Sequence, residues 1–474
     1  MKKLVTSAFL LNQKANLQKI VDILGKEFAY VSVLGTDVIS NRYMVSTSGV
    51  SLQPGTDTQR GFVVRVYQEN GFSEYSFNTM DVEAVCNAVR QVAKEDRASY
   101  IAQKECVSYA RLPQDEQDTC FFVGEVENLP NEDSPKQIIE SLQQMHDQSK
   151  ALYSQIVQLQ VVFIGTQVNK IFISKNKDLY QSYAYATGAA FAVASDSKST
   201  QVDFLTCSGL CGSELLAKIE PLCSEACKRA EELLQAEKVV PGEYDIICDP
   251  DFTGLIAHEA FGHGAEMDMF VKKRAKGMEY VQKRVASDKV NMHDGAKSAE
   301  EVSSYIFDDE GNLGTDTKII EKGILKTGIC DELSAILLGS KSTGNGKRES
   351  YRRKAYARMT NTFFAEGTDK LEDMIASIEK GYLLEGFSSG MEDPKNWGIQ
   401  CVASKGREII NGKLTGKIVS PVYLTGYVPD LLCSISMVSD GLRHSGSGYC
   451  GKGWKEWVKT ATGGSYIKAK GRLS

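Results

Sequence analysis

Apolar spacing and helix-capping residues predict three helices in the first part of the chain. Residues 13–26 carry them at intervals of three and four, which predicts a helix. Asp81 has the side chain of a typical N-cap, so a helix is expected to follow over 82–95. A third helix is predicted from 134 to about 156, because Pro135 suits a first helical turn.

Runs of β-branched and aromatic residues predict strands between these helices. The clearest case is a hairpin over 61–77, in which two such runs flank Asn70 and Gly71, a pair that tight primed turns prefer. Helices and strands alternate up to about residue 200, so we expect an α/β domain with a mixed sheet. Further strands are predicted over 158–165, 170–176 and 188–195.

The pattern changes at Pro241 and Gly242, after a helix that is predicted over 224–236. A chain of 474 residues is too long for one ordinary core. We therefore predict an N-terminal α/β domain over 1–238 and a C-terminal β-rich domain over 239–474. The short strands of the second domain, separated by Gly and Asn turns, are typical of an antiparallel sandwich or barrel. The predicted fold class is α+β.

The composition is that of an ordinary globular protein, with 42% hydrophobic and 24% charged residues. A formal net charge of -6 argues against direct binding of nucleic acid, which favours a basic surface. Thr6 and Ser7 interrupt the apolar residues near the N-terminus, so we expect a first helix there rather than an export signal. No stretch approaches the ~18 apolar residues of a membrane span. We expect a cytoplasmic protein.

The strongest chemical signal is the run GLIAHEAFGHG, in which Glu259 follows His258 and His263 lies five residues after His258. Imidazoles are common zinc ligands, and a carboxylate beside the metal can accept a proton from water. A spacing of five puts the two histidines ~140° apart on an ideal helix, too far for one ion. A π-bulge would restore a shared face, and Gly262 lies where the backbone would have to deform. The alternative is a helix end with two unrelated histidines.

A catalytic zinc usually has three protein ligands and one water. The third ligand would come from elsewhere in the chain, and the residues alone leave several candidates open. A thiolate suits zinc, and Cys450 lies in the glycine-rich run GSGYCGKG. Composition does not choose between Cys450 and His444. The full set of candidates is Glu266, Asp268, His293, His444 and Cys450.

The other cysteines offer a weaker metal signal. Twelve cysteines are scattered along the chain without a CxxC pair, which favours free thiols in a reducing cytoplasm over disulfides. Cys207 and Cys211 are four residues apart, as are Cys223 and Cys227, and each pair would share one face of a helix. This spacing leaves a second metal site open as an alternative to buried structural cysteines, which are favoured.

Several segments resemble, in the same order, the TldD/PmbA family, whose members are often labelled modulators of DNA gyrase. The run GLIAHEAFGHGAEMD is similar to the metal segment of the TldD branch, which the PmbA branch lacks. Ala357 stands where the family usually has Pro, and residues 453–458 depart from the family pattern after CGK, which puts substrate preference and partner surface in doubt. The matching segments are 60–78, 254–268, 342–348, 357–367, 379–390 and 450–453.

The resemblance implies a zinc peptidase that acts on small or unfolded polypeptides. It implies that His258, His263 and Cys450 hold the Zn2+ ion and that Glu259 is the general base. It also implies a dimer, formed either by two identical chains or with a PmbA/TldE-like paralogue. An extended peptide would bind by adding a strand to an exposed sheet edge.

Further side chains are expected to support this chemistry. Arg358, Tyr351 and His444 are candidates for stabilising the oxyanion or for contacting the substrate. Glu266 and Asp268 are candidates for orienting the histidines, because metal-bound imidazoles usually donate to an acceptor behind them.

Two rival interpretations remain. Gly446 and the Gly451-Lys452 pair nearly form a P-loop, but Gly453 replaces the hydroxyl residue that would hold magnesium, and strand and turn rather than a helix are expected to follow. The second rival is a regulatory module without metal or protease activity, which the gyrase label suggests.

Overall fold

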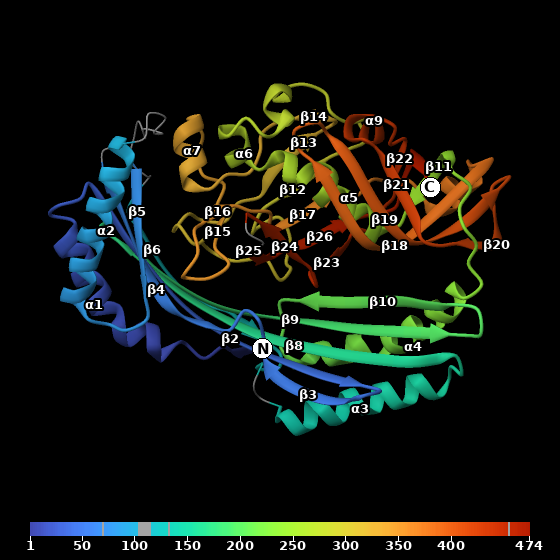
Figure 1. The fold of residues 1–474 in the computed structure, drawn as a ribbon, viewed down its shortest axis with the longest axis horizontal. Helices are drawn as coiled ribbons and strands as arrows, with labels where there is room; N and C mark the ends of the chain where they lie inside the picture. Colours follow the sequence, from blue (N-terminus) through green and yellow to red (C-terminus); the bar gives the residue numbers. More distant parts are fainter. Residues whose placement is uncertain (69–70, 103–114, 131–132, 454–455) are drawn as a thin grey trace.

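The computed structural model describes residues 1–68, 71–102, 115–130, 133–453 and 456–474. Helices and strands are both abundant, which confirms the α+β fold class. In Figure 1 the sheet of residues 1–238, called the N-terminal region here, lies below the C-terminal region, residues 239–474. The segment that joins them runs from α4 (Leu216–Leu233) to β11 (Gly242–Cys248). The domain boundary near residue 238 stays a prediction.

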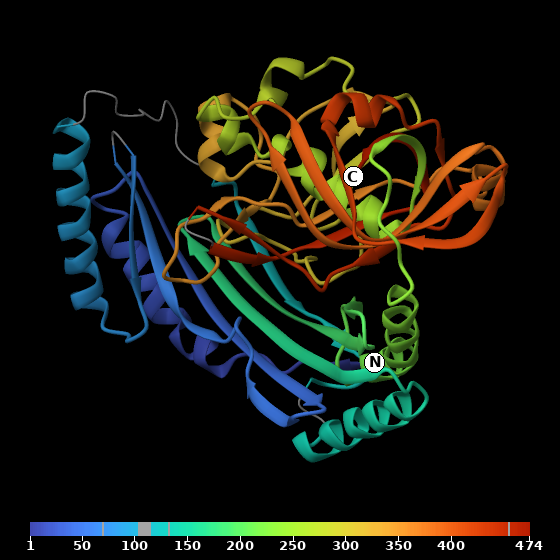
Figure 2. The same ribbon diagram turned by 45° about the vertical axis from the view of Figure 1, so that its right-hand side comes forward.

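The N-terminal region is built around one long, curved sheet (Figures 1 and 2). In the described residues its strand order is β10-β9-β8-β2-β4-β5, with β3 beside β2 and β6 beside β9. Neighbouring strands are antiparallel except for β6 and β9, so the predicted mixed sheet is confirmed. The strands are β2 (Tyr30–Ser46), β3 (Gly49–Pro54), β4 (Gln59–Gln68), β5 (Gly71–Phe77), β6 (Asp118–Val123), β8 (Ile156–Ser174), β9 (Lys177–Ser195) and β10 (Thr200–Gly209).

Four helices of the described residues accompany this sheet: α1 (Ala8–Leu24), α2 (Val82–Ala102), α3 (Pro135–Ala151) and α4, with a short turn η1 (Ser213–Leu215) before α4. The short strand β1 (Lys2–Lys3) pairs with β7 (Glu125–Val126) apart from the sheet. Asp81 accepts the backbone N–H of Ala84 at 3.0 Å, which confirms its capping role, but α2 continues beyond the predicted end at residue 95. Helix α3 ends before the predicted residue 156, because β8 begins there.

Two further predictions concern strands. The hairpin is confirmed by the pairing of β4 with β5, in which Gln68 lies opposite Gly71, while Asn70 lies outside the described residues. The runs 158–165 and 170–176 are one continuous strand, β8, rather than two. The polar residues between them do not interrupt it, because β2 and β9 pair with β8 through this stretch.

Helix α4 packs against β8, β9 and β10 through a buried stripe at helical spacing. The predicted helix over 224–236 begins earlier, at Leu216, because Ile219 continues this stripe. Small side chains on β9 let the helix approach closely; they are Ala186, Ala190, Ala192 and Ala194. Cys223 and Cys227 belong to the stripe, and in the described residues these cysteines form no group with metal-ligand spacing.

The C-terminal region contains a closed barrel. In the described residues its order is β11-β18-β19-β21-β27, and β27 pairs back to β11. All these pairs are antiparallel except β11 with β18, so the predicted barrel-like, mostly antiparallel architecture is confirmed. The strands are β18 (Lys380–Asp393), β19 (Gly398–Ile410), β21 (Val422–Tyr427) and β27 (Ile467–Leu473), with β20 (Lys413–Val419) beside β19 and β22 (Met437–Val438) beside β27.

A second sheet faces the barrel, with the order β14-β13-β12-β17-β26-β23 in the described residues. Its strands are β12 (Met292–Asp294), β13 (Thr317–Glu321), β14 (Ile324–Leu325), β17 (Asn361–Phe364), β23 (Arg443–Ser445) and β26 (Ala461–Gly464). Two separate hairpin pairs are β15 (Gly346–Lys347) with β16 (Tyr356–Ala357), and β24 (Tyr449–Lys452) with β25 (Glu456–Lys459). The short helices are α6 (Met267–Val271), α7 (Glu332–Leu338), α8 (Leu371–Ala376), α9 (Val428–Cys433) and η4 (Lys276–Tyr280).

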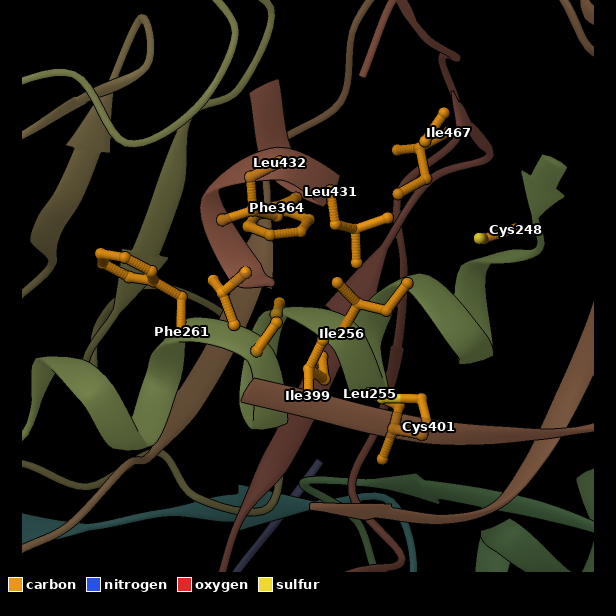
Figure 3. Close-up of a cluster of buried hydrophobic side chains, with 14 of the residues drawn as sticks. Cys248, Leu255, Ile256, Phe261, Phe364, Ile399, Cys401, Leu431, Leu432 and Ile467 are labelled. Atoms are coloured by element: carbon orange, nitrogen blue, oxygen red, sulfur yellow. The ribbon is translucent and has the colours of Figure 1, made fainter. Parts of the chain in front are cut away.

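Helix α5 (Pro250–Ile256) lies between these two sheets and contacts both β18 and β26. Figure 3 shows Leu255 and Ile256 of this helix among side chains of the barrel and of α9. Because apolar residues surround it, burial holds α5 and the turn that follows it in one place. Among the described residues, no helix combines the length and the apolar character that crossing a membrane requires.

Buried ion pairs join the N-terminal sheet to the C-terminal region. Arg65 Nη1 lies 2.6 Å from Glu310 Oε1, and both side chains are almost fully buried. Lys170 of β8 pairs with Asp309 close by. Such pairs fix the relative position of their partners, because a buried charge without its partner is costly.

Candidate metal centre

The turn after α5 carries the two histidines of the HEAFGH run. Asp249 caps α5 by accepting the backbone N–H of Phe252 at 2.8 Å, and Pro250 occupies the first turn. Residues Ala257–Gly262 (η2) then form a π-helical turn, and the backbone N–H of His263 donates to the carbonyl of His258. The predicted π-bulge is therefore confirmed, and it turns the two rings toward each other, with 5.2 Å between their centroids.

Gly262 has a different role from the predicted one. Its backbone is ordinary helix, with φ -59° and ψ -51°, so the prediction that it supplies conformational freedom is wrong. The reason for a glycine here is space, because a Cβ atom would lie 2.2 Å from the sulfur of Met359. Gly390 of β18 makes room in the same way, since a Cβ there would lie 2.5 Å from Cγ of Glu259.

Cys450 reaches the histidines from the far end of the sequence. It lies on β24, and its Sγ atom is 3.6 Å from Nε2 of His263. One potential ligand atom from each of His258, His263 and Cys450 lies within 4.8 Å of the other two. They line a cleft of about 520 Å³ together with Glu259, whose Oε2 is 3.9 Å from His263 Nε2. Nδ1 of His258 is buried and has no hydrogen-bond partner among the described residues.

The charges of the cleft favour a thiolate at Cys450. Burial alone would raise the pKa of this thiol, but charge and hydrogen bonding from His258 and His263 outweigh it and lower the pKa to about 4. The thiolate is the form of cysteine that binds metals. A thiolate and two histidine rings are thus brought together in one cleft.

Glu266 and Lys452 lie behind the histidines and the hairpin. The Oε2 atom of Glu266 is 3.2 Å from Nδ1 of His263, the nitrogen that faces away from Cys450. Lys452 lies 3.1 Å from the same carboxylate and 2.7 Å from Asp268, whose carboxylate also pairs with Lys272. Burial would raise the pKa of Glu266, but Lys452, His263 and Arg358 lower it, so this residue is an anionic acceptor.

The remaining candidates lie outside the cleft. Arg358 is buried, and its guanidinium donates to the backbone carbonyls of Cys450 and Glu456. Tyr351 lines a separate cavity between the two regions. His444 packs edge-on against Phe363, with 4.9 Å between the ring centroids, and His293 stacks on the other side of that ring.

Sequence reasoning missed Glu392, which lines the cleft from β18 and accepts the backbone N–H of Gly264 at 3.1 Å. Burial raises the pKa of its carboxyl well above the usual value. No sequence motif surrounds this residue, which reaches the site because β18 contacts the η2 turn. After Lys452 the chain forms the β24–β25 hairpin, as expected, and not the helix of a P-loop; Trp454 and Lys455 lie outside the described residues.

The site lies within the part of the chain that matches a known family model. Residues 241–462 match the model described as the PmbA/TldA metallopeptidase C-terminal domain. A metalloprotease TldD homolog of Buchnera aphidicola (from Acyrthosiphon pisum) is 35% identical over 236 residues, which are 50% of this chain and 49% of the relative. The match thus spans about half the length of that relative.

Two archaeal relatives extend the comparison. A metalloprotease of Methanocaldococcus jannaschii is 27% identical over 420 residues, which are 87% of this chain and 90% of the relative. A protein of Saccharolobus solfataricus that is named zinc metalloprotease TldD homolog is 31% identical over 244 residues, 51% of this chain and 54% of the relative.

Solved structures share the whole fold at low sequence identity. A Thermotoga maritima protein named as a modulator of DNA gyrase superposes with a TM-score of 0.79 at 16% identity, covering 97% of this chain and 100% of that one. TldE from Thermococcus kodakarensis gives a TM-score of 0.74 at 18% identity and covers 97% and 99%. At such identities the likeness is one of fold, while the sequence matches carry the relationship. The C-terminal part of the chain is thus similar in sequence to TldD metalloproteases and matches the PmbA/TldA metallopeptidase model.

Proposed function

We propose that the protein is a zinc-dependent peptidase in which His258, His263 and Cys450 hold the metal. The observation that carries the proposal is the convergence of these three side chains within 4.8 Å. Bond lengths in a tetrahedral zinc site imply about 3.5 Å between a sulfur and a nitrogen ligand, and Cys450 Sγ lies 3.6 Å from His263 Nε2. Two imidazoles and a thiolate are a typical zinc donor set. The metalloprotease names of the relatives support the same activity.

Zinc at this site would supply Lewis acidity, polarising the scissile carbonyl and making water more acidic. Glu259 would be the general base, because its carboxylate faces the same space as Nε2 of His263 at 3.9 Å. It would take the proton of the attacking water and deliver it to the leaving amine. Glu266 would hold the ring of His263 in position through Nδ1, as acceptors behind metal-bound imidazoles do.

Arg358, Tyr351 and His444 have no oxyanion role in this mechanism. Arg358 is occupied by the backbone of the β24–β25 hairpin, and the other two side chains lie outside the cleft. Asp268 is likewise left out of the histidine contacts, since its carboxylate pairs with Lys452 and Lys272.

The substrate would be an extended peptide, bound as an added strand. The edge of β18 beside Gly390 supports this, because it flanks the cleft. One edge of β18 pairs with β19 along its length. On the opposite edge β11 pairs only with residues 381–384, so among the described residues no strand pairs with that edge beside Gly390. The fold shared with TldE supports a dimer, with a second copy or with a TldE-like paralogue as the partner.

The test compares Glu259→Gln with wild type for zinc content and for cleavage of an unfolded peptide. We expect equal zinc in both proteins and at least a ~100-fold lower kcat in the variant, since a general base contributes that much. Glu279→Gln, at an exposed glutamate, is the matched control and should cleave like wild type. Undiminished cleavage by Glu259→Gln would remove this residue from the mechanism, and a folded protein that binds no zinc would favour a metal-free regulatory module.

A further inference from the structure

The segment that leads into Cys450 lies against the N-terminal sheet. Strand β23 contacts β10, and in Figures 1 and 2 the hairpin β24–β25 lies on the side of the C-terminal region that faces this sheet. The backbone N–H of Gly446 donates to the hydroxyl of Ser208 at 2.7 Å. The hydroxyl of Ser447 donates to that of Thr206 at 2.8 Å. Two polar side chains of β10 thus hold the glycine-rich approach to Cys450.

A third contact reaches the residue next to Cys450. The hydroxyl of Tyr449 donates to Oδ2 of Asp57 at 2.8 Å, and Asp57 belongs to the loop between β3 and β4. Tyr185 of β9 donates to the same oxygen at 2.7 Å, so the carboxylate is held in place by its own sheet. The ammonium of Lys459, opposite Tyr449 in the hairpin, lies 4.3 Å from the centroid of the Tyr449 ring.

The C-terminal region holds the other side of the cysteine. Arg358 binds the carbonyl of Cys450 itself, and Lys452 donates to the carbonyl of Ala357 at 2.9 Å. These bonds fix the backbone at Cys450 and after it, whereas the contacts with Asp57, Thr206 and Ser208 fix the residues before it. The histidines have no comparable dependence, because their turn is enclosed in the apolar core of the C-terminal region.

We propose that the N-terminal sheet positions the Cys450 thiol, so that its docking completes the metal centre. Asp57, together with Thr206 and Ser208, acts as a positioning residue that touches neither metal nor substrate. The inference rests on the proposed function, in which Cys450 is a zinc ligand. Its consequence is that metal affinity depends on a part of the chain outside the region that contributes the ligands.

The experiment uses the full chain with Tyr449→Phe, which removes only the hydroxyl, and Asp57→Ala as a second variant. Zinc affinity is measured by chelator competition, and we expect it to fall about 10-fold, as it does when groups behind a ligand are removed. In the metal-free protein, mass spectrometry should show faster alkylation of Cys450 by iodoacetamide. In the cobalt-loaded protein, the sulfur-to-cobalt charge-transfer band should weaken.

One control separates positioning from general loosening. Lys170→Met breaks the ion pair with Asp309, which joins the same two regions without involving Asp57 or Tyr449. This variant should keep wild-type alkylation of Cys450 and zinc affinity. Equal effects of Lys170→Met and Tyr449→Phe would overturn the inference, as would wild-type values for both Tyr449→Phe and Asp57→Ala.

The Cys450→Ala background distinguishes this failure from a failure of the proposed function. If Cys450→Ala leaves zinc affinity unchanged, the ligand set itself is wrong. If it weakens zinc binding, the same background tests the mechanism, because Tyr449→Phe should then cause no further loss. A full additional 10-fold loss in that background would show that Tyr449 acts by a route other than the thiol.

Discussion

His258 and His263 extend from a turn that is packed in apolar side chains, whereas Cys450 extends from a hairpin that polar groups hold. Around the histidines, Ile256 and Phe261 are fully buried within the core cluster. Around the cysteine, Arg358 binds backbone carbonyls and Asp57 binds the neighbouring tyrosine. The same cleft is thus assembled from one part of a hydrophobic core and one part of a hydrogen-bonded interface.

The difference matters because the two kinds of support respond to different changes. Apolar packing is non-directional and tolerates small shifts in conditions, while its loss costs stability for the whole fold. Buried hydrogen bonds to charged groups fix direction, and losing one partner leaves the other unsatisfied. We therefore expect variants on the histidine side to act mainly through stability and variants on the cysteine side to act also through metal binding.

The largest loss of stability is expected on the histidine side, from Phe261→Ala. Phe261 is fully buried, so its truncation leaves a cavity, and such changes cost about 3–5 kcal/mol in free energy of unfolding. Urea denaturation measures the loss. Variant protein that remains folded in buffer should bind zinc with near wild-type affinity, and a specific loss of zinc affinity without destabilisation would contradict the comparison.

Arg358→Met, on the cysteine side, should lower both the free energy of unfolding and the affinity for zinc. The variant removes the side-chain donor to two backbone carbonyls and a cation that faces Glu266 Oε1 at 3.9 Å. A loss of about 3 kcal/mol in free energy of unfolding is expected for a broken buried contact of this kind, with weaker zinc binding. Arg407→Met, at a partly exposed ion pair of the barrel, is the control and should cost less than about 1 kcal/mol. Unchanged zinc affinity in Arg358→Met would show that the hairpin holds the thiol without this residue.

Asp249, the N-cap of α5 before the histidine turn, makes the stability of the fold depend on pH. Burial, followed by the charge of Asp251, raises the pKa of its carboxyl from the usual 3.8 to about 7. Between these values the folded chain keeps a proton that the unfolded chain has lost, so stability falls as pH rises. One pKa unit is worth ~1.4 kcal/mol, so the free energy of unfolding should fall by about 2 kcal/mol from pH 5 to pH 7.

Asp249→Asn tests this pH dependence, because Asn caps helices as well as Asp does and carries no charge. Urea denaturation at pH 5 and pH 7 should show a smaller difference in free energy of unfolding for the variant than for wild type. An unchanged difference would mean that other groups carry the pH dependence.

The sequence predicted those elements that depend on neighbouring residues, such as helix caps and turns. Asp81 and Ser134 begin helices as expected, and the five-residue spacing of the histidines correctly predicted a π-helical turn. The continuity of β8 and the length of α4 depend on partners far along the chain, which periodicity does not encode. Asp57 and Tyr449 are 392 positions apart in the sequence, and no motif predicts the hydrogen bond between them.

The candidate site likewise combines features that the sequence predicted with features that depend on distant partners. The candidate residues His258, His263 and Cys450 came from motif and resemblance, and the structure brings them together. Glu392 was missed because a lone glutamate in a strand has no signature, and Gly262 was assigned to the wrong cause. A glycine that supplies space and one that supplies backbone freedom look identical in a sequence, and only the neighbour across the core distinguishes them.

Gly262→Ala gives the smallest expected effect and tests this last distinction. A Cβ atom would lie 2.2 Å from Met359 Sδ, and overpacking of a core costs about 1–3 kcal/mol. Alanine also gains about 1 kcal/mol over glycine inside a helix, so the net loss in free energy of unfolding should be near ~1 kcal/mol. In a Met359→Ala background, which removes the clash, Gly262→Ala should stabilise the fold, because only the preference of alanine over glycine inside a helix then remains. If Gly262→Ala destabilises equally in both backgrounds, the glycine is needed for its backbone after all, and the histidine turn would depend on strain rather than on packing.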